Sequence, residues 1–545
     1  MINAIVRVPP PKNEPVLSYA PNTPERTELK EVLRRFSSER VEIPLVIGGK
    51  QVRTGKTSEV RMPHRHAHLL GTYHEADSTQ VEKAIAAAMA AKNAWANTAF
   101  HERAAIFLRA AELLAARYRP LINAATMLGQ SKTAHQSEID AACESTDFLR
   151  FNVHFAEQLI TQQPESGPQM WDLTDYRPLD GFVLAVSPFN FTSIAVNLPT
   201  APALMGNTVV FKPASTAIYS AWVLIELLRE AGLPDGVINF VPGKGSVVGD
   251  TVLRSPDLGG IHFTGSTGVF QGMWKQIGEN ITRYRQYPRL VGETGGKDFI
   301  FAHASAGEEL DSLAVAIVRG GYEYQGQKCS AVSRVYAPES IWPKLKARLQ
   351  EMIAEIRIGD VVDFRNFMGA VIDENSFKNV SSYIELAKKS SDATIIAGGE
   401  TDRSTGWFVR PTLIQVTNPK HRIMCEEIFA PVVSVYVYPD AQYEEMLRVC
   451  DQSAPYALTG AIFARDRKAI NIALRELRFA AGNFYINDKP TGAVVGQQPF
   501  GGSRASGTND KAGSALNLVR WVSARTIKEN FVPPTRWSYP FMAAD

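Results

Sequence analysis

A single cysteine, Cys329, stands in the segment Gly320–Arg334, behind glycines and polar residues and ahead of the apolar run Ala331–Ala337. This pattern predicts a loop that presents a thiol. A thiol is nucleophilic only as the thiolate, and a cationic neighbour such as Lys328 or nearby backbone N–H groups can lower its pKa. A buried, inert cysteine fits the local sequence equally well. The other motifs of the chain decide between the two.

Three histidines, His64, His66 and His68, stand close enough together to suggest a metal-binding tract. No cluster of carboxylates or cysteines accompanies them, which favours a surface loop. The four cysteines of the chain lie far apart without a CxxC pair, as expected for reduced thiols rather than a disulfide scaffold or a zinc site. We therefore expect no bound metal.

Length and charge narrow the class of protein. A chain of 545 residues exceeds the length at which one hydrophobic core keeps growing, so two or three domains are expected. Its 58 basic and 56 acidic residues nearly balance, which argues against nucleic acid or an anionic membrane as a partner. We expect a small-molecule substrate.

The sequence contains no recognisable targeting signal or membrane-spanning segment. No apolar segment is long enough to span a bilayer, so no membrane partner is expected. The first residues lack both the apolar run of a signal peptide and the Arg/Ser-rich character of a transit peptide. We expect a cytoplasmic protein of bacterial type, with a processed mitochondrial form as the alternative.

Capping residues and apolar spacing in the amino-terminal part predict helices on both sides of a hairpin. Thr23-Pro24-Glu25 supplies an N-cap, an N1 proline and an early acid for a helix that continues to Phe36. Ile43–Arg53, with two glycines between apolar runs, predicts a hairpin. Apolar residues at helical spacing predict three further helices near residues 79–95, 101–118 and 136–160.

From Gly181 onward, short β-rich runs alternate with helices, which argues for βαβ units and a parallel sheet. Ligands bind at the carboxyl ends of such strands. After one of them, Gly265, Ser266 and Thr267 open a helix whose backbone N–H groups can face a pyrophosphate, although many such segments are only turns. The expected strands are Phe182–Val186, Val209–Phe211, Val237–Val241 and Gly259–Phe263.

A second α/β unit is expected after Gly295-Gly296. The glycine-rich segment Thr491–Arg504 beyond it suits a backbone that approaches a ligand closely. Asn517–Ile527 has the alternation of a strand, and residues around Tyr176–Pro178 can pair with it. Because an exposed edge there is a liability, pairing with a second subunit is expected.

Five stretches together resemble the aldehyde dehydrogenase superfamily. They follow that family's order and approximate spacing, and the resemblance covers the chain from about residue 45 to its end. The closing segment Thr491–Asp510, with Gly129–Thr133 and Ser137–Asp140, is similar to the narrower subfamily of 1-pyrroline-5-carboxylate dehydrogenases. The five stretches are Pro188-Phe-Asn190, Phe263-Thr-Gly-Ser-Thr267, Glu293-Thr-Gly-Gly-Lys297, Gly326-Gln-Lys-Cys329 and Glu426-Glu-Ile-Phe-Ala-Pro431.

The resemblance implies an α/β fold with two doubly wound domains, a Rossmann-type cofactor domain and a catalytic domain, plus a small β arm for oligomerisation. A homodimer or a dimer-based oligomer is expected. The expected divisions are an N-terminal extension at 1–44, a dinucleotide-binding domain at 45–165 and 181–294, a catalytic domain at 295–490, a substrate anchor loop at 491–510 and the arm at 166–180 and 511–545.

The same resemblance implies the reaction. It is the NAD-dependent oxidation of L-glutamate γ-semialdehyde, which is in equilibrium with 1-pyrroline-5-carboxylate, to L-glutamate, the second step of proline catabolism. Cys329 would attack the aldehyde, the Asn190 amide and the Cys329 N–H would hold the oxyanion, and Glu293 would activate the water that hydrolyses the thioester. A capping role for Glu293 and a turn role for Asn190 are the purely structural alternatives.

For the cofactor, Lys212 would meet the adenosine ribose, Ser266 the pyrophosphate and Glu427 the nicotinamide ribose. Ser215 stands where many NAD-preferring relatives carry an acid, so NAD is expected and the use of NADP stays open. The full implied set is Pro188, Lys212, Ser215, Gly265, Ser266, Glu427 and Phe429.

For the substrate, Ser330 with the backbone of Gly492 and Ala493 would bind the α-carboxylate. Phe191 and Phe500 would flank the methylenes, with ordinary core packing as the alternative. Glu138 would meet the amino group unless it is an exposed helical acid.

Two other functions share these residues. One is a dehydrogenase for another semialdehyde, such as succinate semialdehyde, and the other is a catalytically silent binding protein on the same fold. The length leaves no room for a proline dehydrogenase barrel, so such an enzyme is expected only as a separate partner.

Overall fold

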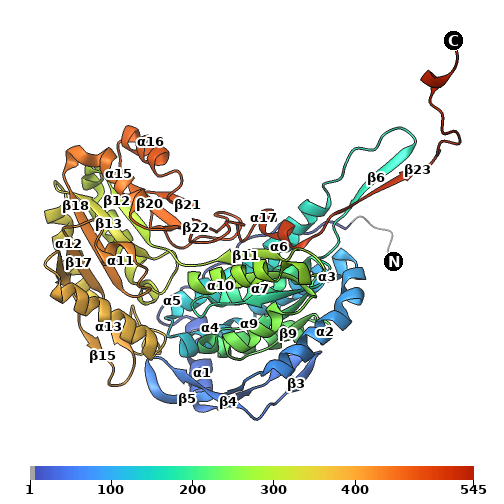
Figure 1. The fold of residues 1–545 in the computed structure, drawn as a ribbon. Coiled ribbons are helices and arrows are strands. Elements are labelled where there is room, and N and C mark those ends of the chain that lie inside the picture. The colour runs from blue at the N-terminus through green and yellow to red at the C-terminus, as the bar shows by residue number, and fades with distance from the viewer. Residues whose placement is uncertain (1–5) are drawn as a thin grey trace.

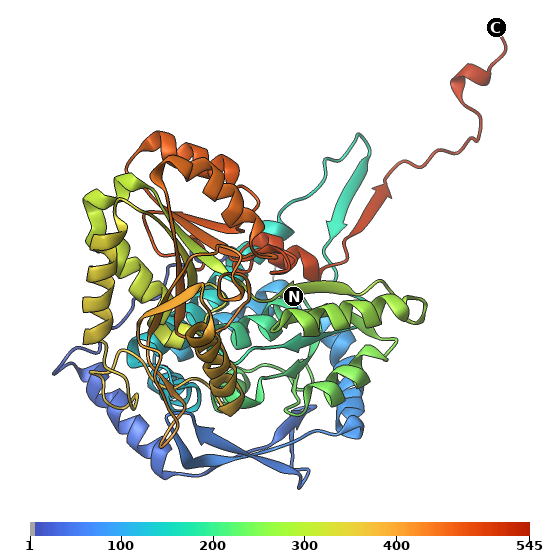
Figure 2. The ribbon, with the colours of Figure 1, turned by 60° about the vertical axis from the view of Figure 1, so that its left-hand side comes forward.

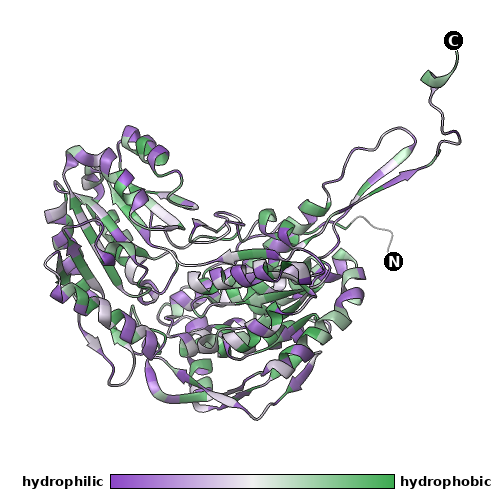
Figure 3. Cartoon of the chain, viewed as in Figure 1, coloured by the Kyte–Doolittle hydropathy of each residue, from purple (hydrophilic) through white to green (hydrophobic). Residues whose placement is uncertain are grey.

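Two seven-stranded sheets form the two lobes of the molecule in the computed structural model, which describes residues 6–545 (Figure 1). The first five residues of the expected 1–44 extension lie outside the described part. Figure 3 shows that the strands of both sheets are the most apolar elements, as expected for sheets buried on both faces. No described helix is long and apolar enough to cross a membrane, and the compartment stays a prediction.

The first sheet is parallel through its first five strands and ends in an antiparallel hairpin. Its order is β11 (Arg289–Glu293), β10 (Leu258–Thr264), β7 (Phe182–Val186), β8 (Thr208–Lys212), β9 (Ile238–Phe240), β2 (Leu45–Ile47) and β3 (Lys50–Val52). The hairpin at β2 and β3 and the predicted strands are confirmed within two residues at each end.

Helices cover both faces of this sheet because the side chains of each strand alternate between them. Phe182 and Leu184 face one core, and Val183 and Ala185 face the other. The first core is shared with α2 (Ser78–Asn97), α9 (Gly245–Leu253) and α10 (Thr267–Glu279), and the second with α3 (Phe100–Ala115), α4 (Arg119–Gln130), α6 (Ser145–Ile160), α7 (Thr192–Leu204) and α8 (Ile218–Glu230).

The second sheet repeats the plan with one antiparallel edge strand. Its order is β14 (Ala393–Ala397), β17 (Thr412–Val416), β18 (Val432–Tyr438), β13 (Val332–Pro338), β12 (Asp298–Ala302), β20 (Thr459–Phe463) and β21 (Asn483–Ile486). One face packs on α11 (Leu310–Tyr322) and α12 (Trp342–Glu355), the other on α13 (Glu374–Lys389), α15 (Tyr443–Gln452) and α16 (Arg467–Glu476). The predicted pair of doubly wound α/β units is confirmed.

A three-stranded sheet near the amino terminus was not predicted. Its order is β1 (Val41–Ile43), β5 (Arg65–His74) and β4 (Thr57–Met62), and it lies close to α1 (Pro24–Ser38) at the bottom of Figure 1. The predicted surface loop around His64, His66 and His68 is therefore wrong, because β5 begins at Arg65. His64 is buried, and its Nδ1 lies 3.1 Å from Ser131 Oγ.

A two-stranded ribbon projects from the body in Figures 1 and 2. In it β23 (Arg525–Asn530) pairs antiparallel with β6 (Met170–Asp175). The predicted strand Asn517–Ile527 is correct only in its last part, because α17 (Ala515–Leu518) and a 3₁₀ turn precede β23. Leu518 and Trp521, three residues apart, are fully buried in the core, so the chain stays helical there.

The long helical stretch before the ribbon contains one irregular turn. Between α5 (Ala134–Ser137) and α6 lies the π-helical segment Glu138–Glu144. The predicted helix near 136–160 is confirmed, but the wider turn changes which of its side chains share a face. Further short strand pairs are β15 (Thr401–Asp402) with β16 (Phe408–Val409) and β19 (Tyr456–Ala457) with β22 (Ser503–Arg504).

Candidate active site

Cys329 lies on a buried loop between α11 and β13. Tyr324 and Gln325 have left-handed backbone angles, with φ of 49° and 56°, and Gly326 follows with φ of 64°. A Cβ on Gly326 would come within 2.3 Å of the Ala430 carbonyl, so only glycine fits this turn. The Gln325 amide donates to the carbonyls of Ser131 and Ala370 at 3.1 and 2.6 Å, which fixes the loop between the lobes.

The loop faces a cavity of about 390 Å³. Cys329 lines it, and so does Glu293, which stands at the carboxyl end of β11 and is paired with Thr264 of β10. The opposite wall is the glycine-rich segment after β21. Of the residues predicted for the substrate, Ser330, Phe191, Phe500, Gly492 and Ala493 all line this cavity.

The charges around Cys329 favour its neutral form. Burial raises the pKa of the thiol well above its usual value, and the neighbouring carboxylates of Glu293, Asp298 and Glu427 raise it further. The expectation that Lys328 lowers this pKa is not borne out, because the Lys328 ammonium lies 3.2 Å from Glu323 Oε2. The thiol therefore needs a base to become a nucleophile.

Glu293 has the properties of such a base. Burial raises the pKa of its carboxyl group to about 7, and the positive charge of Lys511 opposes this shift. Glu293 Oε1 has no hydrogen-bond partner among the described residues. A carboxylate with a pKa near neutrality and a free oxygen can exchange a proton with a thiol or a water.

Asn190 lies beside the Cys329 loop rather than in the cavity wall. Its Nδ2 donates to the Gln327 carbonyl oxygen at 3.1 Å, which leaves the second hydrogen of the amide for another acceptor. The residues after it are held by Asp140, which accepts from the N–H groups of Thr192 and Ser193 at 3.0 and 2.9 Å.

Lys132 also holds the segment that follows Asn190. Its ammonium is buried, lies 2.6 Å from Asp140 Oδ2 and stands 4.4 Å from the centre of the Phe191 ring. The ion pair and the cation–π contact together fix the backbone that follows β7.

The residues predicted for the cofactor gather at one edge of the first sheet. Pro188, Lys212 and Gly265 follow β7, β8 and β10, which are neighbours in the sheet, and Ser266 is the N-cap of α10. Ser215 opens a 3₁₀ turn three residues after Lys212. This is the edge at which open parallel sheets bind nucleotides.

Two groups, Lys212 at this edge and Glu427 from the second lobe, suit a dinucleotide. Burial lowers the pKa of Lys212 to about 8, and its ammonium has no protein hydrogen bond or ion pair within residues 6–545, so ligand oxygens can satisfy it. Glu427 follows the short helix α14 (Arg422–Cys425), and its Oε1 accepts from the Gly296 N–H at 2.9 Å. Phe429 packs edge-on against Phe189, with ring centres 5.8 Å apart. These features fit NAD.

The assignment of Glu138 to the substrate is wrong. Its carboxylate is fully buried and is bound to Arg119, Tyr19, Asn123 and the Leu17 N–H, outside the cavity wall. The alternative of an exposed helical acid is wrong for the same reason.

Sequence reasoning missed Glu144, an acid that does line the cavity. Burial raises its pKa to about 8, and its Oε2 accepts from Ser193 Oγ at 2.9 Å. The π turn hid it, since a regular 3.6-residue period does not describe this segment. Lys489 and Asn13 were also missed, and no local motif marks either one.

Comparisons with known proteins show the family of the chain. Residues 51–527 match the aldehyde dehydrogenase family, and the chain belongs to that family. It is 52% identical over 542 residues to the mitochondrial delta-1-pyrroline-5-carboxylate dehydrogenase of Dictyostelium discoideum, covering 99% of this chain and 97% of the relative.

Solved structures show the same likeness. The Delta-pyrroline-5-carboxylate dehydrogenase of Mycobacterium tuberculosis bound with NAD is 55% identical, with a TM-score of 0.96 over 100% of both chains. Proline utilization A of Bdellovibrio bacteriovorus is 29% identical, with a TM-score of 0.91 over 96% of this chain and 54% of that longer one.

Proposed function

We propose that the protein oxidises L-glutamate γ-semialdehyde, in equilibrium with 1-pyrroline-5-carboxylate, to L-glutamate with NAD, as in proline catabolism. One observation carries the proposal beyond the family. The cavity that holds Cys329 and Glu293 is also lined by Gly492 and Ala493, whose backbone N–H groups donate to no acceptor among residues 6–545. Two free donors opposite a nucleophile suit an aldehyde that carries a carboxylate at its far end.

The chemistry follows from the protonation states. Glu293 accepts the proton of the Cys329 thiol, and the sulfur attacks the aldehyde carbon to give a thiohemiacetal. The oxyanion accepts from the Cys329 N–H and from the free hydrogen of Asn190 Nδ2, a type of contact worth about 10²–10³ in rate. NAD, when bound, supplies the acceptor for the hydride of the oxidation.

Hydrolysis completes the turnover. Once Glu293 has released the thiol proton to solvent and is again a carboxylate, it takes a proton from water, and the resulting hydroxide attacks the thioester carbon on Cys329. The C–S bond breaks, glutamate leaves and the thiol is reformed. A carboxyl group with a pKa of about 7 is suited to both proton transfers near neutral pH.

The far end of the substrate needs three contacts. Ser330 Oγ donates to Thr491 Oγ1 at 2.8 Å, which sets that hydroxyl beside the anchor loop and the α-carboxylate. Phe191 and Phe500 flank the methylenes. For the amino group we replace Glu138 by Glu144, which lines the cavity and whose carboxyl group a positively charged amino group would help to ionise.

The assembly and the supply of substrate are further parts of the proposal. Eight large apolar side chains of the ribbon and tail are exposed, which supports a homodimer or a dimer-based oligomer built through the ribbon. They are Trp171, Ile527, Phe531, Val532, Trp537, Tyr539, Phe541 and Met542. A separate proline dehydrogenase as supplier is supported by the longer chain named for proline utilization, of which this chain matches only 54%.

The test is a substrate series with the purified protein and NAD. Formation of NADH should be fastest with glutamate semialdehyde, slower with succinate semialdehyde and slowest with propanal. Equal kcat/KM for all three would overturn the proposed specificity and leave a general aldehyde dehydrogenase. No turnover together with an unreactive Cys329 would instead favour the silent binding protein. Repeating the series with NADP tests whether the enzyme, which has Ser215 where many NAD-preferring relatives carry an acid, also uses NADP.

A further inference from the structure

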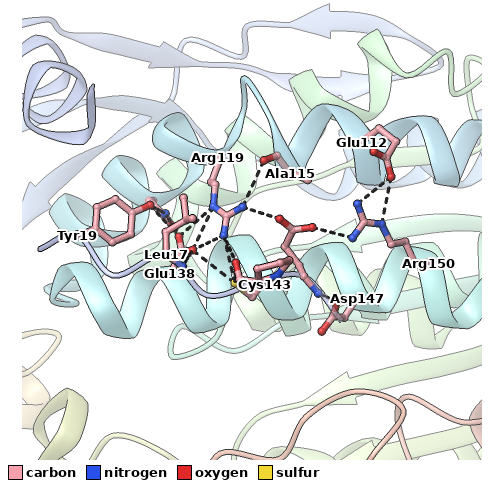
Figure 4. Close-up of polar contacts among 12 residues, drawn as sticks. Leu17, Tyr19, Glu112, Ala115, Arg119, Glu138, Cys143, Asp147 and Arg150 are labelled. Carbon is pink, nitrogen blue, oxygen red and sulfur yellow. Dashed lines mark hydrogen bonds and ion pairs between the residues drawn. The ribbon is translucent and has the colours of Figure 1, made fainter. Parts of the chain in front are cut away.

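An extended segment near the amino terminus, Asn13–Tyr19, is held across the helices of the first lobe by a buried polar network; we call it the strap. Glu14 bridges two arginines, with its Oε1 and Oε2 2.6 and 2.7 Å from Arg119 and Arg150. Figure 4 shows Arg119 and Tyr19 converging on Glu138, which also accepts from the Leu17 N–H. These contacts fix the path of a segment that has no regular secondary structure.

The strap also reaches the substrate cavity. Asn13, Glu14 and Val16 are part of its wall, although about 480 residues separate them in sequence from the anchor loop. Asp147 aligns the end of the strap, because its two oxygens accept from Asn13 Nδ2 at 2.8 Å and from the Glu14 N–H at 2.7 Å.

One side chain connects the strap to the anchor loop. Asn13 Nδ2 donates to the Val495 carbonyl oxygen at 2.8 Å, and Asn13 Oδ1 accepts from Gln497 Nε2 at 3.0 Å. Val495 is two residues from Ala493, whose N–H faces the substrate in the proposed function. The loop's own hydrogen bonds join Val494 to Gln497 and Gln498, so the Val495 carbonyl is held by Asn13 rather than by the loop itself.

We propose that the strap is a working part of the substrate site, in which Asn13 is a positioning residue that holds the anchor loop with its N–H donors aimed at the substrate carboxylate. The inference rests on the proposed function. A loop that must order itself on binding loses affinity for the ligand that needs that order. A loop held by the strap is already ordered before the substrate binds. The strap therefore favours substrates with a carboxylate and leaves the chemistry at Cys329 unchanged.

The experiment compares two substrates in each variant. Asn13→Ala should raise the KM for glutamate semialdehyde about tenfold, as expected for the loss of its two hydrogen bonds to the anchor loop. Its kcat and its kcat/KM for propanal should stay as in the wild type. Lys12→Ala is the matched control, because Lys12 is exposed and contacts no charged or hydrogen-bonding partner among the described residues. This control should leave the kinetic constants for both substrates unchanged.

Gln497→Ala provides an independent arm, since Gln497 is exposed and its loss should not unfold the protein. If the side chains act through one contact, the double variant Asn13→Ala/Gln497→Ala should lose less than the product of the single losses. An unchanged KM in Asn13→Ala, equal losses on both aldehydes, or fully multiplicative effects would overturn the inference. A wild type that shows no preference for the semialdehyde would overturn the proposed function instead.

Discussion

At the scale of single residues, the reactivity of Cys329 depends on where its proton goes. The thiol is neutral in the resting site because burial and three carboxylates oppose its ionisation. We expect Cys329→Ala to reduce NADH formation to background while the affinity for NAD stays close to that of the wild type, because the thiol makes the covalent bond and does not hold the dinucleotide. Steady-state kinetics measure NADH formation, and a titration with NAD measures the affinity. Substantial remaining turnover would contradict the mechanism.

Glu293 offers a second residue-scale prediction. Because the pKa of its carboxyl group is raised to about 7, the base is present above that pH and protonated below it, so hydrolysis should accelerate as pH rises through 7. Glu293→Gln should lose both proton transfers, so its first turnover and its steady rate should each slow roughly 10²-fold or more, without this pH limb. Rapid-mixing kinetics from pH 6 to 8 give both rates. A variant with a wild-type first turnover and a wild-type steady rate would remove Glu293 from the base role.

At the scale of elements, the proposed function assigns recognition of the carboxylate to the anchor loop after β21 and the chemistry to the Cys329 loop. Ala493 is the position to test, since its backbone faces the cavity and its methyl group is small. In Ala493→Leu the added atoms should occupy the space of the carboxylate, and kcat/KM for glutamate semialdehyde should fall at least about tenfold. Propanal needs no carboxylate site and should be oxidised as before. Equal losses on both substrates would indicate a folding defect rather than a lost anchor.

At the scale of the whole molecule, the ribbon of β6 and β23 extends beyond the body, and isolated two-stranded ribbons are marginally stable. A second copy of the chain can supply the missing contacts. We expect Ile527→Glu to shift the protein toward monomer in light scattering, because it replaces an exposed apolar side chain of the ribbon by a charged one. Leu474→Glu, at an exposed apolar position on α16, is the control and should leave the mass unchanged. An unaltered mass in Ile527→Glu would exclude the ribbon as the dimer contact.

The sequence by itself determined the two α/β units, the hairpin at β2 and β3 and the motifs around Cys329, Glu293 and Asn190. It could do so because apolar runs, glycine turns and strand ends are local signals, and parallel strands deliver the residues at their ends to one edge. It also determined the family, since the five motifs keep their order along the chain.

Only the tertiary structure decided the rest. It exchanged Glu138 for Glu144 at the cavity, because one π-helical turn rotates the side chains that follow. It made the Cys329 thiol neutral, because carboxylates from distant strands converge on it while Lys328 turns to Glu323. It brought Asn13 to the anchor loop across more than 480 residues. Burial, pKa and such contacts are set by which distant segments surround a group, and no local pattern in the sequence carries that information.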